Sequence, residues 1–452
     1  MKKIAMTVLM CVSVLLMVFL TGCSKTPTFE SVTDSQLFSS VPLVSGEKIT
    51  FSDVNDVGGG DYQIWAYDAT LSEYQSYGTL LEKEGYKKYA DNGENGIEGY
   101  VYISHYLKDK LLVVTTYYTR LGDMTVTVSE NTALSEYLIY DESYVANNKP
   151  DAKTTLTMQE LYVAGNSFIF QLKDGSFIIN DGGQEDDLPY LLDYLESLTP
   201  DGQKPVVKAW VVTHSHADHM GVFVAFSKNA TWANRICVEN VYFTEASTVA
   251  HEMTNASVSA LTFYSKSIPS TFKNSEGKAP NVYRMRQGER YYFNDITMDV
   301  VYEQAILSHK DWKTWNATST ALMYTIEGQK VFLTADIDYE CQMRILDIFP
   351  DEYFKLAVYQ TPHHGGNVYN NFTFHLTVGT VLYARYQLNA AVSGLQARWD
   401  QGNFLKERAE ETLGWLEGGV RLTFPYTTGT YERLPLIEWK YNKEVPARFQ
   451  TK

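Results

Sequence analysis

Apolar and polar residues alternate in steps of two along four segments between residues 46 and 140: "YQIWAYDA", "GYVYISHYL", "KLLVVTTYYT" and "MTVTVSE". Such alternation between turn residues predicts β-strands with one buried face. In "TLSEYQSYGTLLEKEGYKKY" apolar residues recur at helical spacing instead, at Tyr74, Tyr77, Leu80 and Leu81. Gly85 then marks the end of the predicted helix. We therefore expect residues 46–140 to form a small α+β domain, one helix on an antiparallel meander of three or four strands.

Two stretches outside this domain have no sustained period. Residues 23–45 are rich in Ser, Thr and Pro, which predicts a tether ahead of the first domain. Residues 141–154 are polar and rich in turn residues, which predicts a linker.

A mixed pattern follows the predicted linker. Strand patterns such as "SFIIND" and "KAWVVT" occur together with helical patterns such as "DLPYLLDYLESL". Strands, hairpins and crossing helices over residues 155–445 predict sheets covered by helices, an α/β layered domain.

The amino terminus has its own pattern. Two lysines precede an apolar run from Ile4 to Leu20, and small residues follow. This predicts a secretory signal peptide over residues 1–22 rather than a membrane-spanning helix. The ending "LTGC" resembles the lipobox of bacterial lipoproteins, which implies cleavage before Cys23 and lipidation of Cys23. An uncleaved signal anchor is the alternative, and in both cases the folded part lies at the extracellular face of the cell membrane.

Charge narrows the range of partners. The chain carries a formal net charge of −16, and loss of the signal's two lysines makes the remainder more acidic. This acidity argues against a large basic groove for nucleic acid, although a local basic channel stays open. The expected partners are a small-molecule or cell-envelope substrate and, through the lipid anchor, the membrane.

Only two of the four cysteines are expected in the folded part, and two cysteines in a chain of this length make no disulfide framework or Cys-based zinc ribbon. Cys11 lies in the signal and Cys23 is the expected lipidation site, which leaves Cys237 and Cys341 for the folded part. Apolar residues flank both, which favours buried free thiols over a bridge between them.

Three of the nine histidines fall within "VVTHSHADHMGV", residues 211–222. Side chains alternate in an extended segment, so His214 and His216, at the end of a buried strand, project to the same side. A helix that begins near Asp218 brings Asp218 and His219 to a second position nearby. Imidazole and carboxylate suit Zn²⁺, and also Mn²⁺ or Fe²⁺, so we expect two neighbouring sets of metal ligands.

The string His-x-His-x-Asp-His, from His214 to His219, resembles the signature of the metallo-β-lactamase-fold hydrolases. Further motifs follow the order of this family within residues 155–440: "FIINDGG" with Asp181, "VFLTAD" with Asp336, and "AVYQTPHHGG" with His363 and His364. The resemblance implies an αββα sandwich, here preceded by the small α+β domain, and two divalent metal ions with Zn as the first expectation.

The same resemblance assigns roles. The implied metal ligands are His214, His216, Asp218, His219, Asp336 and His364, with Asp336 bridging the two ions. Asp181 is expected to accept a hydrogen bond from one ligand imidazole and so to fix its orientation, the alternative being a strand-end Asp that starts a Gly-Gly turn. Asp218 and His363 are the candidate catalytic residues, His363 as an acid for the leaving group or a donor to a phosphoryl oxygen. The reverse assignment of His363 and His364 stays open.

Asn316 departs from the family's pattern, because it stands where many members have a third histidine for the first metal. An amide is a poor zinc ligand. The ion at His214 and His216 is then held with Asp336 alone, or with His251 or His309 from a loop, although both loop histidines are expected on the surface.

Two other polar residues are expected to be structural. His105 lies alone in a predicted strand, which is typical of an exposed or core-packed histidine rather than a ligand. Asp338 is expected to be a solvated turn carboxylate.

Within the superfamily, the motif form resembles the competence-protein hydrolase domains and the secreted phosphorylcholine esterases. An aspartate rather than a cysteine at position 336 favours a two-metal hydrolase over the zinc β-lactamases. The expected function is phosphodiester hydrolysis by a hydroxide that bridges the two metals. Two alternatives remain: hydrolysis of a lactone or β-lactam with the same metals, and a binding lipoprotein whose metal chemistry Asn316 impairs.

Overall fold

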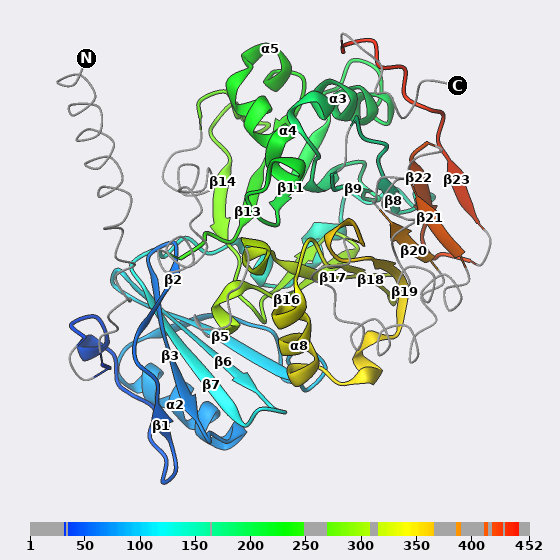
Figure 1. The fold of residues 1–452 in the computed structure, drawn as a ribbon. Coiled ribbons are helices and arrows are strands. Elements are labelled where there is room, and N and C mark those ends of the chain that lie inside the picture. The colour runs from blue at the N-terminus through cyan, green and yellow to red at the C-terminus, as the bar shows by residue number, and fades with distance from the viewer. Residues whose placement is uncertain are drawn as a thin grey trace, which may run out of the picture.

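The computed structural model describes residues 31–32, 35–162, 165–247, 269–307, 315–365, 386–389, 411–414, 418–427 and 430–442. Within these ranges the chain forms three β-sheets with few helices (Figure 1). None of the described helices is both long enough and apolar enough to cross a membrane. The mixed α/β fold class predicted from the sequence is confirmed, whereas Cys23 lies outside the described residues.

The first sheet is antiparallel and has seven strands, more than the three or four predicted. Its order is β1-β3-β7-β6-β5-β4, and β2 pairs with β3. Helix α2 (Leu71–Lys83) begins at a capping box between Thr70 and Glu73 and buries Tyr74, Tyr77 and Leu81 against the sheet. The strands are β1 (Thr50–Phe51), β2 (Asn55–Gly58), β3 (Asp61–Tyr67), β4 (Lys87–Asp91), β5 (Val101–Lys108), β6 (Leu111–Tyr118) and β7 (Asp123–Ser129).

Part of the predicted tether packs on this sheet. A short 3₁₀ helix spans Phe38–Ser40, and Phe38, Val41 and Val44 are buried in the same apolar cluster as Ile64. This end of residues 23–45 is therefore folded rather than free. Its apolar residues follow neither a helical nor a strand period, so the sequence pattern does not reveal their burial.

The second and third sheets carry the remaining strands. The second runs β14-β13-β11-β10-β9-β8-β22-β23, with β12 beside β11, and the third runs from β15 to β21 in chain order. Strands β10, β11, β13 and β14 are parallel, as are β18 to β21, so within each set the carboxyl ends meet at one edge. The second sheet comprises β8 (Thr155–Met158), β9 (Ser167–Gln171), β10 (Phe177–Asp181), β11 (Val206–Val212), β12 (Cys237–Val238), β13 (Asn240–Phe243), β14 (Asn281–Arg284), β22 (Val420–Thr423) and β23 (Tyr431–Arg433). The third comprises β15 (Arg290–Phe293), β16 (Ile296–Tyr302), β17 (Ala321–Ile326), β18 (Gln329–Leu333), β19 (Leu356–Gln360), β20 (Tyr386–Asn389) and β21 (Glu411–Gly414).

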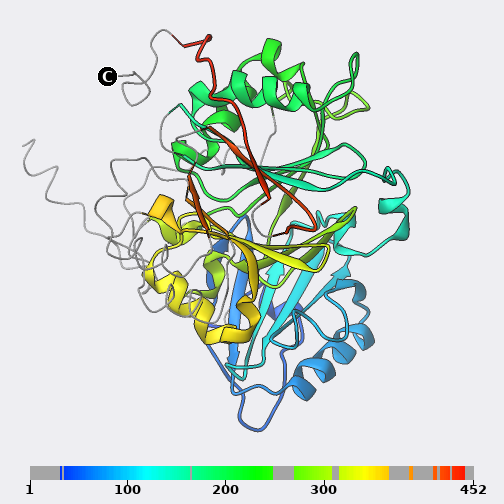
Figure 2. The same ribbon diagram turned by 90° about the vertical axis from the view of Figure 1, so that its right-hand side faces the viewer.

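These two sheets face one another, and helices cover their outer faces (Figure 2). Alternate residues of each strand, such as Ile178 and Tyr324, fill the apolar cluster between the sheets. The opposite face of the second sheet packs on α3 (Leu188–Ser197) and α4 (Ala217–Lys228), which α5 (Ala230–Ala233) follows. The opposite face of the third sheet packs on α8 (Tyr339–Ile348). The resulting order of layers is helix, sheet, sheet, helix.

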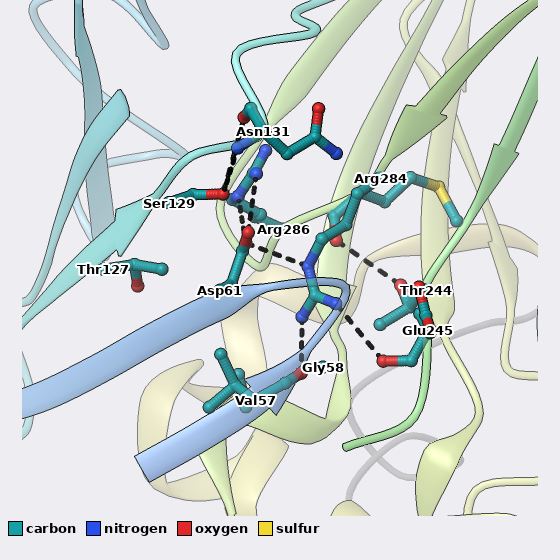
Figure 3. Close-up of polar contacts among 12 residues, drawn as sticks. Val57, Gly58, Asp61, Thr127, Ser129, Asn131, Thr244, Glu245, Arg284 and Arg286 are labelled. Carbon is teal, nitrogen blue, oxygen red and sulfur yellow. Dashed lines mark hydrogen bonds and ion pairs between the residues drawn. The ribbon is translucent and has the colours of Figure 1, made fainter. Parts of the chain in front are cut away.

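Buried charges join the first sheet to the rest of the molecule (Figure 3). Asp61, on β3, accepts a hydrogen bond from Nε of Arg286 at 2.8 Å and forms an ion pair with Nε of Arg284 at 3.0 Å. Arg284 also donates to the carbonyl oxygens of Val57 and Glu245, at 2.7 and 3.2 Å. Since apolar residues of the first and third sheets also share one cluster, the first sheet is tightly packed on the others. The domain boundaries at 140 and 155 stay predictions.

His105, on β5, takes part in the same buried contact between the first sheet and the rest of the molecule. Its side chain is buried, and Nε2 lies 2.9 Å from Oε1 of Glu289, also buried. The core-packed interpretation therefore holds, and the exposed one does not.

The two cysteines and Asp338 test smaller predictions. Both cysteines are free thiols, as expected, but the expected burial holds only for Cys341, because Cys237 is half-buried. The prediction that Asp338 is a solvated turn carboxylate is wrong, since Asp338 is buried and caps α8. Its Oδ1 accepts hydrogen bonds from the backbone N–H and Sγ of Cys341, at 3.5 and 2.9 Å.

Candidate metal centre

The candidate ligands come from strand ends of both facing sheets. His214 and His216 follow β11, and His216 is the residue before α4, whose first turn carries Asp218 and His219. On the third sheet Asp336 follows β18, and His363 and His364 follow β19. The strand-to-helix change predicted near Asp218 is therefore present.

The structure places these side chains in two groups. The His219 group consists of Asp218, His219, Asp336 and His364, with ligand atoms within 4.8 Å of one another. Nε2 of His219 lies 3.0 Å from Oδ1 of Asp336, and Nε2 of His364 lies 3.0 Å from Oδ2 of Asp218. The two Nε2 atoms are 3.2 Å apart. Three of these four residues are buried, with Asp218 half-buried.

The His214 group consists of His214, His216 and Asp336. Nε2 of His214 is 2.9 Å from Nδ1 of His216 and 3.9 Å from Oδ2 of Asp336. Asp336 is thus shared: Oδ1 faces the His219 group and Oδ2 faces the His214 group. The two sets expected from the spacing, His214 with His216 and Asp218 with His219, are the sets that the fold brings together.

His363 lies beside the two groups rather than in one. Its side chain is 25% exposed, and Nε2 is 3.9 Å from Oδ2 of Asp336. Asn316 lies next to it, with Nδ2 at 3.3 Å from Nε2 and 3.4 Å from Nδ1 of His363. Asn316 contacts the edge of the centre through His363, while His251 and His309 lie outside the described residues.

Asp181 orients His219 through the imidazole nitrogen that does not face Asp336. Its Oδ2 lies 2.8 Å from Nδ1 of His219 and accepts a hydrogen bond from Asn166 Nδ2 at 3.0 Å. Its Oδ1 accepts from the backbone N–H of Thr213 at 2.8 Å. A carboxylate on Nδ1 keeps the proton there and leaves Nε2 free to ligate. The contact with an imidazole expected of Asp181 is present.

Charges in the His219 group are strongly coupled. Burial by itself lowers the pKa of His219, but Asp336 and Asp181 raise that pKa well above its ordinary value. Burial also lowers the pKa of His364, while Asp336 and Asp218 raise it to about 9. Burial raises the pKa of Asp336, yet His219 and His364 hold it well below the ordinary value. The carboxylates therefore require positive charge at this position, and without a metal ion protons on the histidines supply it.

In the His214 group the pKa values of the histidines are lowered rather than raised. Burial, and then the nearby His219, lower the pKa of His214 well below 6.5, and the same two causes lower the pKa of His216. Both side chains thus present neutral imidazole at pH 7, the form that ligates a metal.

The chemistry of these residues fits metal ions. Oδ1 of Asp336 is buried and faces Nε2 of His219 at 3.0 Å and Nε2 of His364 at 3.5 Å, and apart from these imidazoles it has no hydrogen-bond partner among the described residues. Two pairs of imidazole nitrogens face each other at 2.9 and 3.2 Å, and each close pair has to share a proton or a cation. Histidine and aspartate are ordinary ligands of Zn²⁺, Mn²⁺ and Fe²⁺. The arrangement supplies ligands for one ion in each group.

The backbone around the centre adopts an uncommon conformation. Asp181, Ala335, His363 and His364 have φ values of 65°, 49°, 51° and 49°. Left-handed conformations cost about 1 kcal/mol or more per non-glycine residue. Four of the nine left-handed non-glycine residues among the described positions therefore lie in the turns that carry the ligands and their neighbours.

Three buried polar residues beside the ligands were not predicted from the sequence: Asn166, Thr213 and Gln360. Thr213 Oγ1 donates to Asp181, and Gln360 holds the turn before Asp336. Position is a signal for two of them, because Thr213 and Gln360 stand at the ends of apolar strands that lead to His214 and His363, whereas Asn166 comes directly before β9.

Comparison with known proteins adds little. No model of a protein family matches this sequence, and no curated protein is similar to it in sequence. Among solved structures, the chain is similar to a metallo-β-lactamase from Hirschia baltica, with 11% identity and a TM-score of 0.25, over 55% of this chain and 86% of that chain. At this identity and TM-score the similarity supports no inference about fold or activity. The two groups of candidate ligands are the features that point to a function.

Proposed function

We propose that the protein is a metal-dependent hydrolase of the metallo-β-lactamase fold that holds two divalent ions. Zn²⁺ is the first expectation, and Mn²⁺ or Fe²⁺ the next. The observation that carries the proposal is the position of Asp336, whose Oδ1 lies 3.0 Å from His219 and whose Oδ2 faces His214 and His363, each at 3.9 Å. One carboxylate common to two sets of imidazoles suits a centre with two neighbouring ions.

The ions, when bound, supply positive charge that polarises the bond under attack and lowers the pKa of water. The protein's share is to bind and orient. His214 and His216 offer neutral imidazole, and Asp181 fixes the ring of His219. Asp218, with 28% of its side chain exposed, can orient a water molecule or a substrate hydroxyl group as well as ligate.

His363 is suited to contact the substrate. It is partly exposed, and burial lowers its pKa below 6.5, so it is mainly neutral at pH 7. A neutral imidazole donates one N–H hydrogen bond, which can stabilise an oxygen of the substrate or the leaving group. The adjacent Asn316 amide holds the ring in place. The proposed roles are therefore His364 as ligand and His363 as donor.

The proposed substrates are phosphodiesters of the cell envelope. The "HHGG" motif supports phosphodiester cleavage, and the net charge of −16 favours small or zwitterionic phosphoesters over long polyanions. Lipidation at Cys23 would hold the enzyme at the extracellular face of the membrane, where such substrates occur.

The test uses a soluble chain of residues 24–452. Metal content and hydrolysis of bis-p-nitrophenyl phosphate are measured for the native chain, Asp336→Ala and His216→Ala. Asp186→Ala, which changes an exposed aspartate outside both ligand groups, is the matched control. We expect about two ions per native chain, and loss of turnover in both ligand variants but not in the control.

Other outcomes separate the alternatives. Metal binding without phosphodiester turnover would direct the search to lactones and β-lactams. Failure to bind Zn²⁺ or Mn²⁺ after reconstitution would contradict the hydrolase proposal and favour a binding lipoprotein.

A further inference from the structure

Gln360 contacts the chain segment that carries the shared carboxylate. It is the last residue of β19, and its side chain is completely buried. Oε1 accepts hydrogen bonds from the backbone N–H groups of Thr334, at 2.9 Å, and Ala335, at 3.1 Å. These two residues directly precede Asp336. A single carboxamide oxygen thus holds the turn from which Asp336 extends.

The other end of the same carboxamide reaches the second sheet. Nε2 of Gln360 donates to Oδ1 of Asn166 at 3.3 Å, and Nδ2 of Asn166 donates to Oδ2 of Asp181 at 3.0 Å. That oxygen of Asp181 is the one that lies 2.8 Å from His219. The backbone N–H of Asn166 also donates to the carbonyl oxygen of Asp218, at 2.9 Å. Gln360 and Asn166 therefore connect the Asp336 turn to the segment that carries Asp218 and His219.

We propose that Gln360 is a positioning residue that sets the place of Asp336 relative to the histidines of the opposite sheet, and with it the affinity for metal. This inference rests on the two-ion centre of the proposed function. Ligands have to be held to about 0.5 Å, and loss of a partner that orients them lowers metal affinity about 10- to 100-fold. Apolar packing between the sheets has no directional preference, whereas the carboxamide bonds do.

A carboxamide is well matched to this place because it accepts and donates at once. Methionine has a similar length and no branch, so Gln360→Met keeps most of the packing while it removes every side-chain hydrogen bond. Asn166→Ala breaks the same connection from the second sheet. If the two residues act as one connection, the double variant should bind metal no more weakly than the weaker single variant.

The probe is Co²⁺, titrated into the metal-free full chain against a chelator of known affinity and followed by its visible absorption. We expect Gln360→Met and Asn166→Ala to bind Co²⁺ about 10- to 100-fold more weakly, with an altered absorption band. The matched control is Gln63→Met, since Gln63 is a buried glutamine of the first sheet that donates to Thr127. It should lower the unfolding temperature and leave Co²⁺ binding unchanged.

The outcomes are distinct. Native Co²⁺ affinity and spectrum in Gln360→Met, with only a lower unfolding temperature, would make Gln360 a packing residue and overturn the proposal. If Gln360→Met does not fold, Asn166→Ala decides by the same criterion. A native chain that binds Co²⁺ but hydrolyses nothing would contradict the proposed function, while the affinities would still decide the role of Gln360. A native chain that binds no Co²⁺ would overturn both.

Discussion

Nδ1 of His219 lies 2.8 Å from Oδ2 of Asp181, and neither side chain is exposed to solvent. The contact decides which nitrogen of His219 faces the ligand group, because the carboxylate keeps the proton on Nδ1. Nε2 then points to Asp336, 3.0 Å away. A residue that is no ligand itself thus determines how a ligand is presented.

Replacement of Asp181 by alanine should therefore weaken metal binding without removing any ligand. We expect a loss of affinity of about 10- to 100-fold for the ion of the His219 group, and a smaller effect at the His214 group. Competition with a coloured chelator measures this. Asp174→Ala is a fitting control, because Asp174 lies just before β10, the strand that ends at Asp181, and pairs with Lys208, away from the ligands. Native affinity in Asp181→Ala would contradict the role inferred for Asp181.

His363 and His364 are neighbours with different expected roles. His364 lies in the His219 group and His363 lies outside it, so His364→Ala should lose an ion. His363→Ala should keep both ions and lose about 10²- to 10³-fold in kcat, the usual effect of removing one hydrogen-bond donor to an oxygen that gains charge in the transition state. Metal analysis and steady-state kinetics on the same samples separate the two. The reverse result would exchange the assignments.

Glu303, buried between the first sheet and the others, should make stability depend on pH. Burial raises its pKa from 4.5 to about 7, although Arg284 lowers it. An acid with a raised pKa in the folded state contributes stability that is complete below pH 4.5 and lost as the pH rises through 7. Glutamine cannot ionise, so this loss is absent from Glu303→Gln. The free energy of unfolding of the variant, minus that of the native chain, should therefore increase as the pH rises.

The gain should reach on the order of 3 kcal/mol between pH 4.5 and pH 8. Urea unfolding at a series of pH values measures it, and all other titrating groups cancel in the difference between the two proteins. A difference that stays constant with pH would show that Glu303 ionises normally.

Two glycines of one turn allow a matched test of the contact between sheets. Gly58 and Gly60 have similar left-handed φ values, +89° and +81°. A Cβ on Gly58 would lie 2.1 Å from the carbonyl oxygen of Glu245, whereas a Cβ on Gly60 would meet nothing within 4 Å. Both alanine variants should lose about 1 kcal/mol from backbone strain, and Gly58→Ala about 1–3 kcal/mol more from the clash. Equal losses in chemical unfolding would mean that the turn is not held against Glu245.

Local patterns account for what the sequence predicts well. His214 and His216 lie together because side chains alternate at the end of a strand, and Asp218 and His219 lie together because a helix begins there. Both rules act over a few residues. The shared position of Asp336 follows only from the resemblance, since no local rule brings position 336 to position 214.

The features that the sequence did not predict have different causes. Gln360 and Asn166 are 194 positions apart, and a hydrogen bond over that separation leaves no periodic pattern in the sequence. Asp338 is buried because a helix begins at Tyr339, an element that the sequence analysis did not predict. Phe38 and Val44 pack on the first sheet as isolated apolar residues without a period.

The left-handed residues around the centre bear on how this scaffold could be altered. With Asp181, Ala335, His363 and His364 in strained conformations, the turns that carry the chemistry reduce the stability of the chain. Substitutions that reshape the rim for another substrate would add to that cost in a molecule with a narrow margin of stability. An engineering effort should therefore begin from a variant stabilised far from the ligands, where a new specificity can be selected before the fold is lost.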